Sequence, residues 1–201
     1  MTNVLIIGAT SLVGQKVTKH FLEKTDDHLT LMARNTSMLS IDEKRERVVQ
    51  GDVIDDEPLY KALNGNETVF IAMDSNLAQS VQRIVNGMDR LSIKRLLFIT
   101  SMGVNNEIPV TDGASGNLAE DALLRPYRDA IELIENSDLN YTIIRSGQFD
   151  GSQDTNYVLS HNGEDLQTND VSLNSVADLV IKLTNDNSLD SHDNLGISRV
   201  A

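Results

Sequence analysis

The chain lacks cysteine and tryptophan, and aromatic residues are sparse, with four tyrosines and four phenylalanines. Without cysteine no disulfide framework can form, which suits a protein kept in a reducing compartment. Histidine is also scarce, because the chain has only four, and no pair of them has the spacing of metal ligands. These absences predict a cytoplasmic protein with no bound metal.

Long apolar runs and an excess of positive charge are absent too. No apolar run approaches transmembrane length, and the first strand-like run begins at Val4, which leaves no room for a signal peptide. The 30 acidic residues outnumber the 17 basic ones, giving a formal net charge of -13. Such a surface repels phosphate backbones, and the basic residues between positions 44 and 47 are interleaved with glutamates. We therefore expect neither a membrane nor a nucleic acid as partner.

Strand-like and helix-like segments alternate along most of the chain. The strand-like segments are short, rich in Val, Ile and Leu, and mostly apolar on both faces, as in strands covered on both sides. They are Val4–Ile7, Leu29–Met32, Arg47–Gln50, Thr68–Ala72, Arg95–Thr100 and Tyr141–Arg145. The helix-like stretches are Leu12–Lys24, Pro58–Leu63, Leu77–Leu91 with Ser75 as its N-cap, and Leu118–Asn136. This alternation predicts a fold of the α/β class, a doubly wound parallel sheet.

Two regions interrupt the alternation. Residues 105–117 are polar, contain a proline and two glycines, and are expected to form a loop able to move. From about residue 147 the chain turns polar, with a weak strand at Tyr157–Ser160, a helix at Ser175–Asn185 and a last strand at Gly196–Val200. We interpret residues 1–201 as one domain, of which about 147–201 form a small C-terminal lobe.

The most informative segment is VLIIGATSLVG, from Val4 to Gly14. Gly8 lets the chain turn sharply out of a strand, and Gly14 lets the following helix pack closely on the sheet. A pyrophosphate can then lie over the helix N-terminus, where free N–H groups and the helix dipole favour an anion. The middle glycine of the usual pattern is here Ser11, whose hydroxyl can cap the helix or bond a phosphate.

The segments that follow the second and third strands point to a choice of cofactor. A carboxylate at the end of the second strand favours NAD, whereas a cation accepts the 2′-phosphate of NADP. Arg34 occupies that position, with Asn35 as an additional hydrogen-bonding group, although an arginine facing solvent is the alternative. After the third strand, Asp52 is suited to accept the adenine amino group and Val53 to cover the ring; an ordinary turn aspartate is the competing interpretation.

These segments together resemble a known family. GATSLVG, ARN, GDV, RLLFITSMGV, PYRDAIELIENSDLNYTIIRSGQF and VSLNSVADLV follow one another as in the atypical short-chain dehydrogenase/reductase family. More narrowly, they look like its compact NAD(P)H-binding, NmrA-like members, and the resemblance spans essentially the whole chain. It implies a Rossmann-like fold with a short C-terminal substrate lobe. Members include reductases of small carbonyl or conjugated molecules, epimerase-like proteins, and redox sensors with little or no turnover.

The resemblance also implies roles for individual residues. It places Gly8, Thr10, Ser11, Leu12, Val13 and Gly14 in the phosphate turn, Arg34 and Asn35 at the 2′-phosphate, Asp52 and Val53 at the adenine, and Ala72 and Met73 beside the nicotinamide ribose. Ser101 would hydrogen-bond the substrate carbonyl, Tyr127 would be the active-site tyrosine, and Met102 and Phe149 would line the substrate pocket.

Two positions depart from a working reductase of this family. The lysine that normally stands four residues after the tyrosine, and lowers its pKa, is replaced by Ile131. Tyr127 is thus equally well interpreted as a half-buried residue of an amphipathic helix. The proline usual before the final glycine is Ser146, which is expected to loosen the backbone beside the cofactor.

The cofactor itself carries a hydride transfer, so a reductase does not require the missing lysine. The leading hypothesis is an NADPH-dependent oxidoreductase acting on a small, uncharged carbonyl, quinone or conjugated acceptor. The alternative is a non-catalytic NADP(H)-binding sensor that passes redox state to a protein partner. A sugar-epimerase-like activity is disfavoured, because the lysine matters most there and the C-terminal lobe is short. The sequence leaves the oligomeric state open.

Overall fold

The central feature of the protein, described here from a computed structural model for residues 1–109 and 116–200, is an eight-stranded sheet. Its strand order is β3-β2-β1-β4-β5-β6-β10-β8, and all neighbours run parallel except β8, which pairs antiparallel with β10. The strands are β1 Asn3–Ile7, β2 His28–Ala33, β3 Glu46–Gln50, β4 Thr68–Ile71, β5 Arg95–Ser101, β6 Asn140–Ser146, β8 Tyr157–Ser160 and β10 Asp193–Arg199. The predicted Rossmann-like α/β fold is thereby confirmed.

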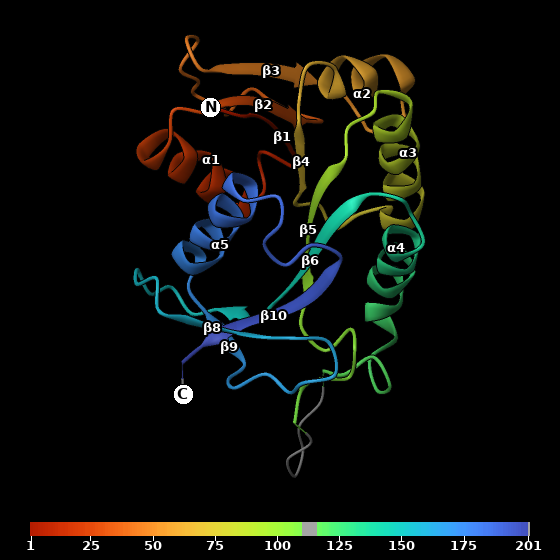
Figure 1. The fold of residues 1–201 in the computed structure, drawn as a ribbon, viewed down its shortest axis with the longest axis vertical. Coiled ribbons are helices and arrows are strands. Elements are labelled where there is room, and N and C mark those ends of the chain that lie inside the picture. The colour runs from red at the N-terminus through yellow and green to blue at the C-terminus, as the bar shows by residue number, and fades with distance from the viewer. Residues whose placement is uncertain (110–115, 201) are drawn as a thin grey trace.

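Helices cover both faces of the sheet (Figure 1). They are α1 Leu12–Lys24, α2 Asp56–Leu63, α3 Leu77–Arg90, α4 Arg125–Glu135 and α5 Leu173–Asn185, with a short 3₁₀ turn, η1, at Ala122–Leu124. A separate two-stranded pair joins β7 Gln148–Phe149 to β9 Asp170–Val171. Helices α1 and α5 pack together on one face, and α2, α3 and α4 lie on the other.

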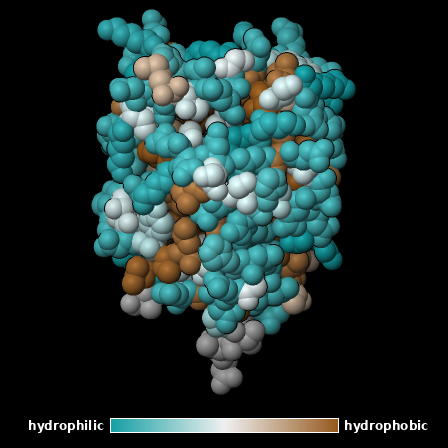
Figure 2. Space-filling view, viewed as in Figure 1, coloured by the Kyte–Doolittle hydropathy of each residue, from teal (hydrophilic) through white to brown (hydrophobic). Residues whose placement is uncertain are grey.

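Two apolar cores result from this layering. On β1, Leu5 and Ile7 face the core beneath α2, α3 and α4, whereas Val4 and Ile6 face the core beneath α1 and α5. Because the side chains of a strand alternate between the faces of a sheet, a strand covered on both sides is mostly apolar along its whole length. The continuous apolar runs of the sequence therefore reflect this double burial. The side of the molecule seen in Figure 2 is mostly hydrophilic.

The last strand begins earlier than its apolar pattern suggests. It runs from Asp193 rather than Gly196, and its first residues pair with β6 in parallel, Asp193 opposite Thr142. Asn194 is buried there, and its side chain bonds Arg145 and Glu135. The apolar pattern does not indicate this part of the strand, because its residues are polar and form hydrogen bonds with partners distant in the sequence.

The predicted helix 118–136 is α-helical only from Arg125, after the 3₁₀ turn η1. Asp121 accepts a hydrogen bond from the Leu123 amide at 2.9 Å and starts η1, and Pro126 occupies the first turn of α4. Proline suits the first turn of a helix but lacks the N–H that a longer helix would need there. Ser75 is likewise not the N-cap of α3: Asn76 is, in the left-handed conformation at φ 50°.

Candidate functional site

A groove runs along the carboxyl ends of the parallel strands. Its first part, a cleft of about 270 Å³, is lined by residues that follow β1, β2, β3 and β4. Its second part, about 540 Å³, is lined mainly by residues that follow β4, β5 and β6 and by residues near the start of α4. Ser11, Ala72, Met73 and Asp74 line both, so the two clefts join. Ligands of open α/β sheets bind at this end, where the strand order reverses beside β1.

The two glycines of the first turn have no room for a side chain. Gly8 has φ +84°, and a Cβ there would overlap the carbonyl oxygen of Ala72 at the end of the neighbouring strand. A Cβ on Gly14 would overlap the carbonyl oxygen of Gly8 itself. The turn out of β1 and the close packing of α1 therefore both require glycine, for the reasons expected from the sequence.

Ser11 caps α1, and its Oγ accepts a hydrogen bond from the Gly14 amide at 3.0 Å. The Leu12 and Val13 amides bond no acceptor among the residues that the structure describes. Free amides at the positive end of a helix dipole form a site for an anion. Thr10, Ser11, Leu12 and Val13 all line the groove, as a phosphate-binding turn requires.

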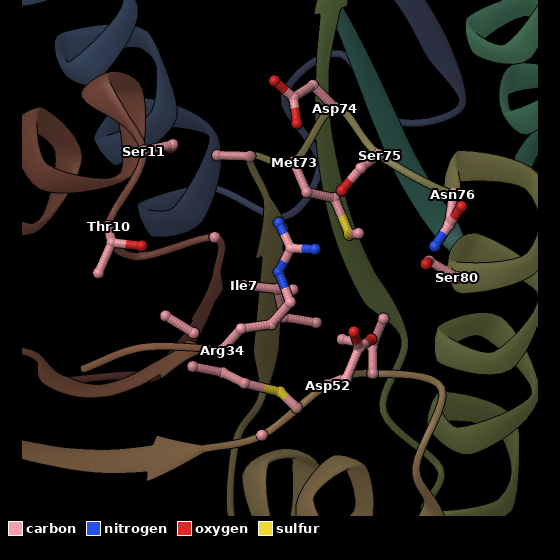
Figure 3. Close-up of a pocket in the computed structure, with 16 residues that line it drawn as sticks. Ile7, Thr10, Ser11, Arg34, Asp52, Met73, Asp74, Ser75, Asn76 and Ser80 are labelled. Atoms are coloured by element: carbon pink, nitrogen blue, oxygen red, sulfur yellow. The ribbon is translucent and has the colours of Figure 1, made fainter.

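Arg34 follows β2 and directs its guanidinium into the first cleft (Figure 3). The guanidinium forms no ion pair or hydrogen bond within the described part of the chain. Asn35 is exposed, its Oδ1 accepts a bond from the Ser37 amide at 3.0 Å, and it is not among the residues that line the cleft. Of the two, only Arg34 is placed to meet a ligand.

Asp52 and Val53 line the same cleft on the side of α2. Val53 is buried in the apolar core, and Asp52 accepts a hydrogen bond from the Ile54 amide at 3.2 Å, as turn aspartates do. The turn interpretation of Asp52 is therefore confirmed, while its contact with adenine stays a prediction that its place in the cleft allows.

The first cleft also contains residues that sequence reasoning missed. Asn76 and Ser80 approach it from α3, on the side opposite Thr10 (Figure 3). Ser80 is only 1% exposed, and its hydroxyl has no hydrogen-bond partner in residues 1–109 and 116–200. The available signal was a serine set into the apolar face formed by Leu77, Val81 and Ile84.

The second cleft gathers Ser101, Met102, Tyr127 and Phe149, which the sequence assigned to a substrate site. Ser101 ends β5 and lies opposite Ser146 of β6. Met102 is buried, and Phe149 is partly exposed at the edge. Predicted from separate segments, these side chains do line one cavity, beside Ala72 and Met73, which follow β4.

Tyr127 is half-buried and packs against the core beneath α4, whose Ile131 is fully buried. Burial, and secondarily the charge of Asp74, raises the pKa of the Tyr127 phenol above its ordinary value. A lysine does bond a tyrosine in this chain, but away from the groove: Lys182 of α5 donates to the Tyr157 hydroxyl at 2.9 Å. Tyr127 is therefore a neutral hydrogen-bond donor at ordinary pH.

Ser146 does not loosen the backbone, contrary to expectation. It is buried, pairs with Ser101 on one side and Ile197 on the other, and donates its hydroxyl to the Gly147 carbonyl at 2.9 Å. Its own carbonyl accepts the Met102 amide at 2.9 Å. Pairing on both edges fixes this position without a proline.

Comparisons with known proteins agree with this geometry. A protein family described as NAD(P)H-binding matches residues 8–187. The structure resembles a short-chain dehydrogenase/reductase from Veillonella parvula DSM 2008 with a TM-score of 0.87, 25% identity and coverage of 99% of this chain and 95% of that one. A structure of the Veillonella parvula protein in complex with NADP gives a TM-score of 0.87 at 24% identity, covering 98% and 94% of the two chains.

A reductase of known substrate is a more distant relative. It is a (4-alkanoyl-5-oxo-2,5-dihydrofuran-3-yl)methyl phosphate reductase from Streptomyces griseus, 23% identical over 146 residues. The match covers 73% of this chain, but the chain spans only about half of that relative, 48% of its length. The described residues contain no group of acidic, histidine or cysteine side chains placed to hold a metal. Every described helix is also too short or too polar to span a bilayer.

Proposed function

We propose, from the premise that the chain belongs to this NAD(P)H-binding family, that it is an NADPH-dependent oxidoreductase of small uncharged acceptors. One observation carries the proposal: the groove joins a helix-starting turn with free amides and the unpaired Arg34 guanidinium to a second cleft that contains Ser101 and Tyr127. The first part of the groove suits the cofactor, and the second suits a carbonyl, quinone or conjugated acceptor. The cofactor supplies the hydride when it is bound.

The residues of the first cleft favour NADPH over NADH. The Leu12 and Val13 amides suit the pyrophosphate, and Arg34 suits the 2′-phosphate, since a guanidinium binds phosphate through several donors at once. No carboxylate stands at the end of β2 to accept the ribose hydroxyls of NADH, because the strand is followed directly by Arg34 and Asn35.

The residues of the second cleft suit orientation more than acid catalysis. Ser101 donates a hydrogen bond to the acceptor oxygen, and Met73, Met102 and Phe149 surround its apolar body. Tyr127 is protonated and adds a second donor, but it lacks the cation that would lower its pKa. Solvent then supplies the proton that completes the reduction.

The Streptomyces griseus relative supports a reductase but not its substrate. That protein acts on a phosphate ester, according to its name. The described lining of the second cleft contains no lysine, arginine or histidine that would pair with a phosphate. We therefore propose an uncharged acceptor for this chain, in contrast to the phosphate ester that the relative's name gives as its substrate.

Titration with NADPH and NADH, followed by nicotinamide fluorescence, tests the cofactor part. We expect Arg34→Ala to weaken NADPH binding by roughly 10- to 100-fold, the value of a hydrogen bond to a charged group. NADH binding should change little. Lys19→Ala, which removes a cation from the exposed face of α1, is the matched control. Equal losses for both nucleotides would contradict the 2′-phosphate assignment.

NADPH oxidation by a panel of quinones and aldehydes tests the reaction. Ser101→Ala should lower kcat/KM by about fivefold or more, because a hydrogen bond of about 1 kcal/mol is lost. Exposed Ser40→Ala is the control. An unchanged rate in Ser101→Ala would remove the role assigned to that hydroxyl.

Ile131 favours a second candidate, a sensor that binds NADP(H) without turnover and signals to a protein partner. Such a protein would bind NADPH, oxidise it with no acceptor of the panel, and show different amide hydrogen exchange with NADP⁺ and NADPH. Identical exchange with both forms would contradict the sensor.

A further inference from the structure

The second cleft carries negative charge and no compensating cation. Its only charged lining residues within the described chain are Asp74 and Asp121. Residues 110–115, which lie outside that range, include one aspartate and neither lysine, arginine nor histidine in their sequence. The Asp121 carboxylate accepts the Leu123 amide, whereas Asp74 forms no hydrogen bond or ion pair with any described residue. The negative charge of Asp74 is therefore free to act on a ligand.

Two arginines near the cleft are paired with other carboxylates, whereas Arg34 lines only the first cleft and the exposed Arg125 is not among the lining residues of either cleft. Arg128 of α4 is paired with Glu132 and Glu135. Arg145 of β6 is wholly buried and paired with Glu107. Asp74 and Tyr127 line the cleft together, and the charge of Asp74 contributes to the raised pKa of the Tyr127 phenol.

Two exposed apolar side chains line the same cleft, and a third is next in sequence to a lining residue. Leu12 is 62% exposed and Phe149 is 38% exposed, and both line it. Leu123, which precedes the lining residue Leu124, is 80% exposed. Single exposed apolar residues are common on protein surfaces, but a group at one cleft indicates a ligand with an apolar body.

A buried hydroxyl in the cleft has no partner. Thr100 lines it at the end of β5, is 5% exposed, and its Oγ1 has no hydrogen bond to any described residue. An unsatisfied buried hydroxyl is costly and is rare without a reason, so a polar ligand atom or a bound water is expected to meet it.

We propose that the second cleft takes an apolar acceptor that is neutral or positively charged, with Asp74 as the residue that disfavours anions and Thr100 as a hydrogen-bond partner. The inference rests on the proposed function, in which the cofactor fills the first cleft and leaves the second for the acceptor. The phosphates of the bound cofactor would add to the negative potential.

Binding of three matched redox-inert ligands to the NADPH-saturated protein, in which the dihydronicotinamide ring is uncharged, tests this by calorimetry. The ligands are naphthalenes that bear a hydroxymethyl, a trimethylammonium or a sulfonate group. We expect the sulfonate to bind about tenfold or more weakly than the other two at low salt. In Asp74→Asn, the difference between sulfonate and trimethylammonium should shrink by about threefold or more. Asp129→Asn, an exposed α4 residue outside the cleft, changes net charge equally and should leave the difference intact.

Thr100→Val tests the hydroxyl without changing the shape of the side chain. It should weaken binding of the hydroxymethyl ligand by about threefold or more while leaving the protein at least as stable, because a buried unpaired group is removed. Equal affinities for all three ligands, or binding of none, would overturn the inference. Charge selection without NADPH turnover would contradict the proposed reductase function but support the charge preference of the cleft. Turnover without charge selection would support the reductase function but contradict the charge preference.

Discussion

Arg145 and Glu107 form an ion pair in the interior, with 2.6 Å between Nη1 and Oε1 and both side chains almost fully buried. The pair belongs to a closed cycle of contacts. Side chains link Glu107 to Arg145, Arg145 to Asn194, Asn194 to Glu135, Glu135 to Arg128, and Arg128 to Asn105. The backbone closes the cycle, because the Asn105 amide donates to Glu107 Oε2 at 2.9 Å. The cycle ties the loop after β5 to α4, β6 and β10.

We expect Arg145→Met to lower the free energy of unfolding by about 3–5 kcal/mol, since it leaves Glu107 charged and buried. Urea denaturation measures this loss. The double variant with Glu107→Gln should recover part of it, because no uncompensated charge remains. A loss below about 1 kcal/mol for the single variant would show that the pair is not buried as described.

Ser11→Ala and Ser172→Ala remove the serine caps of α1 and α5, since Ser172 accepts the Ser175 amide as Ser11 accepts that of Gly14. Ser11→Ala should cost about 1 kcal/mol of stability in urea denaturation, and Ser172→Ala more, because the buried Ser172 hydroxyl also donates to the Asp154 carbonyl. Only Ser11→Ala should also weaken NADPH binding, because only α1 begins at the groove. Equal NADPH affinity in both variants would mean that Ser11 serves the helix alone.

The raised pKa of Tyr127 predicts the pH profile of the proposed reduction. Raising a phenol's pKa keeps it protonated to higher pH, so no titration of Tyr127 falls between pH 6 and about pH 9. Steady-state kcat/KM should therefore be flat across that range in wild type and in Tyr127→Phe. An inflection near neutral pH that disappears in Tyr127→Phe would show that another group lowers this pKa.

Glu46 offers a test of stability against pH. Burial raises the pKa of its carboxyl, and one of its oxygens has no partner in the described part of the chain. A raised folded-state pKa stabilises the protein below the ordinary value and loses that contribution as pH rises through the folded-state value. Glu46→Gln should accordingly be more stable than wild type at pH 7, and the difference should shrink toward pH 4. A constant difference across this range would contradict the shift.

Local patterns predicted the parts of the site that depend on local structure. The turn between β1 and α1 could be predicted from the spacing of Gly8, Ser11 and Gly14, because most of the contacts that fix it lie within this one short segment. The position of Arg34 followed from the end of β2 in the same way. That these residues hold a cofactor remains a prediction, tested by the titrations above.

Long-range contacts explain what the sequence concealed. The buried hydroxyls of Ser80 and Thr100 read as ordinary polar positions until α3 and β5 are placed beside the groove. Asn194 looked like a loop residue because its partners lie 49 and 59 positions away. Ser146 looked loose beside the cofactor for the same reason: its two pairing strands come from other parts of the chain.

The residues shared by the two clefts have a kinetic consequence. Because Ser11, Ala72, Met73 and Asp74 line both, a molecule that fills the first cleft becomes part of the wall of the second. If the bound cofactor raises the affinity of the acceptor by some factor, the bound acceptor must raise the affinity of the cofactor by the same factor. The two partners of the reaction are thus expected to bind in a fixed order, cofactor first, and the acceptor to slow the departure of the cofactor beneath it.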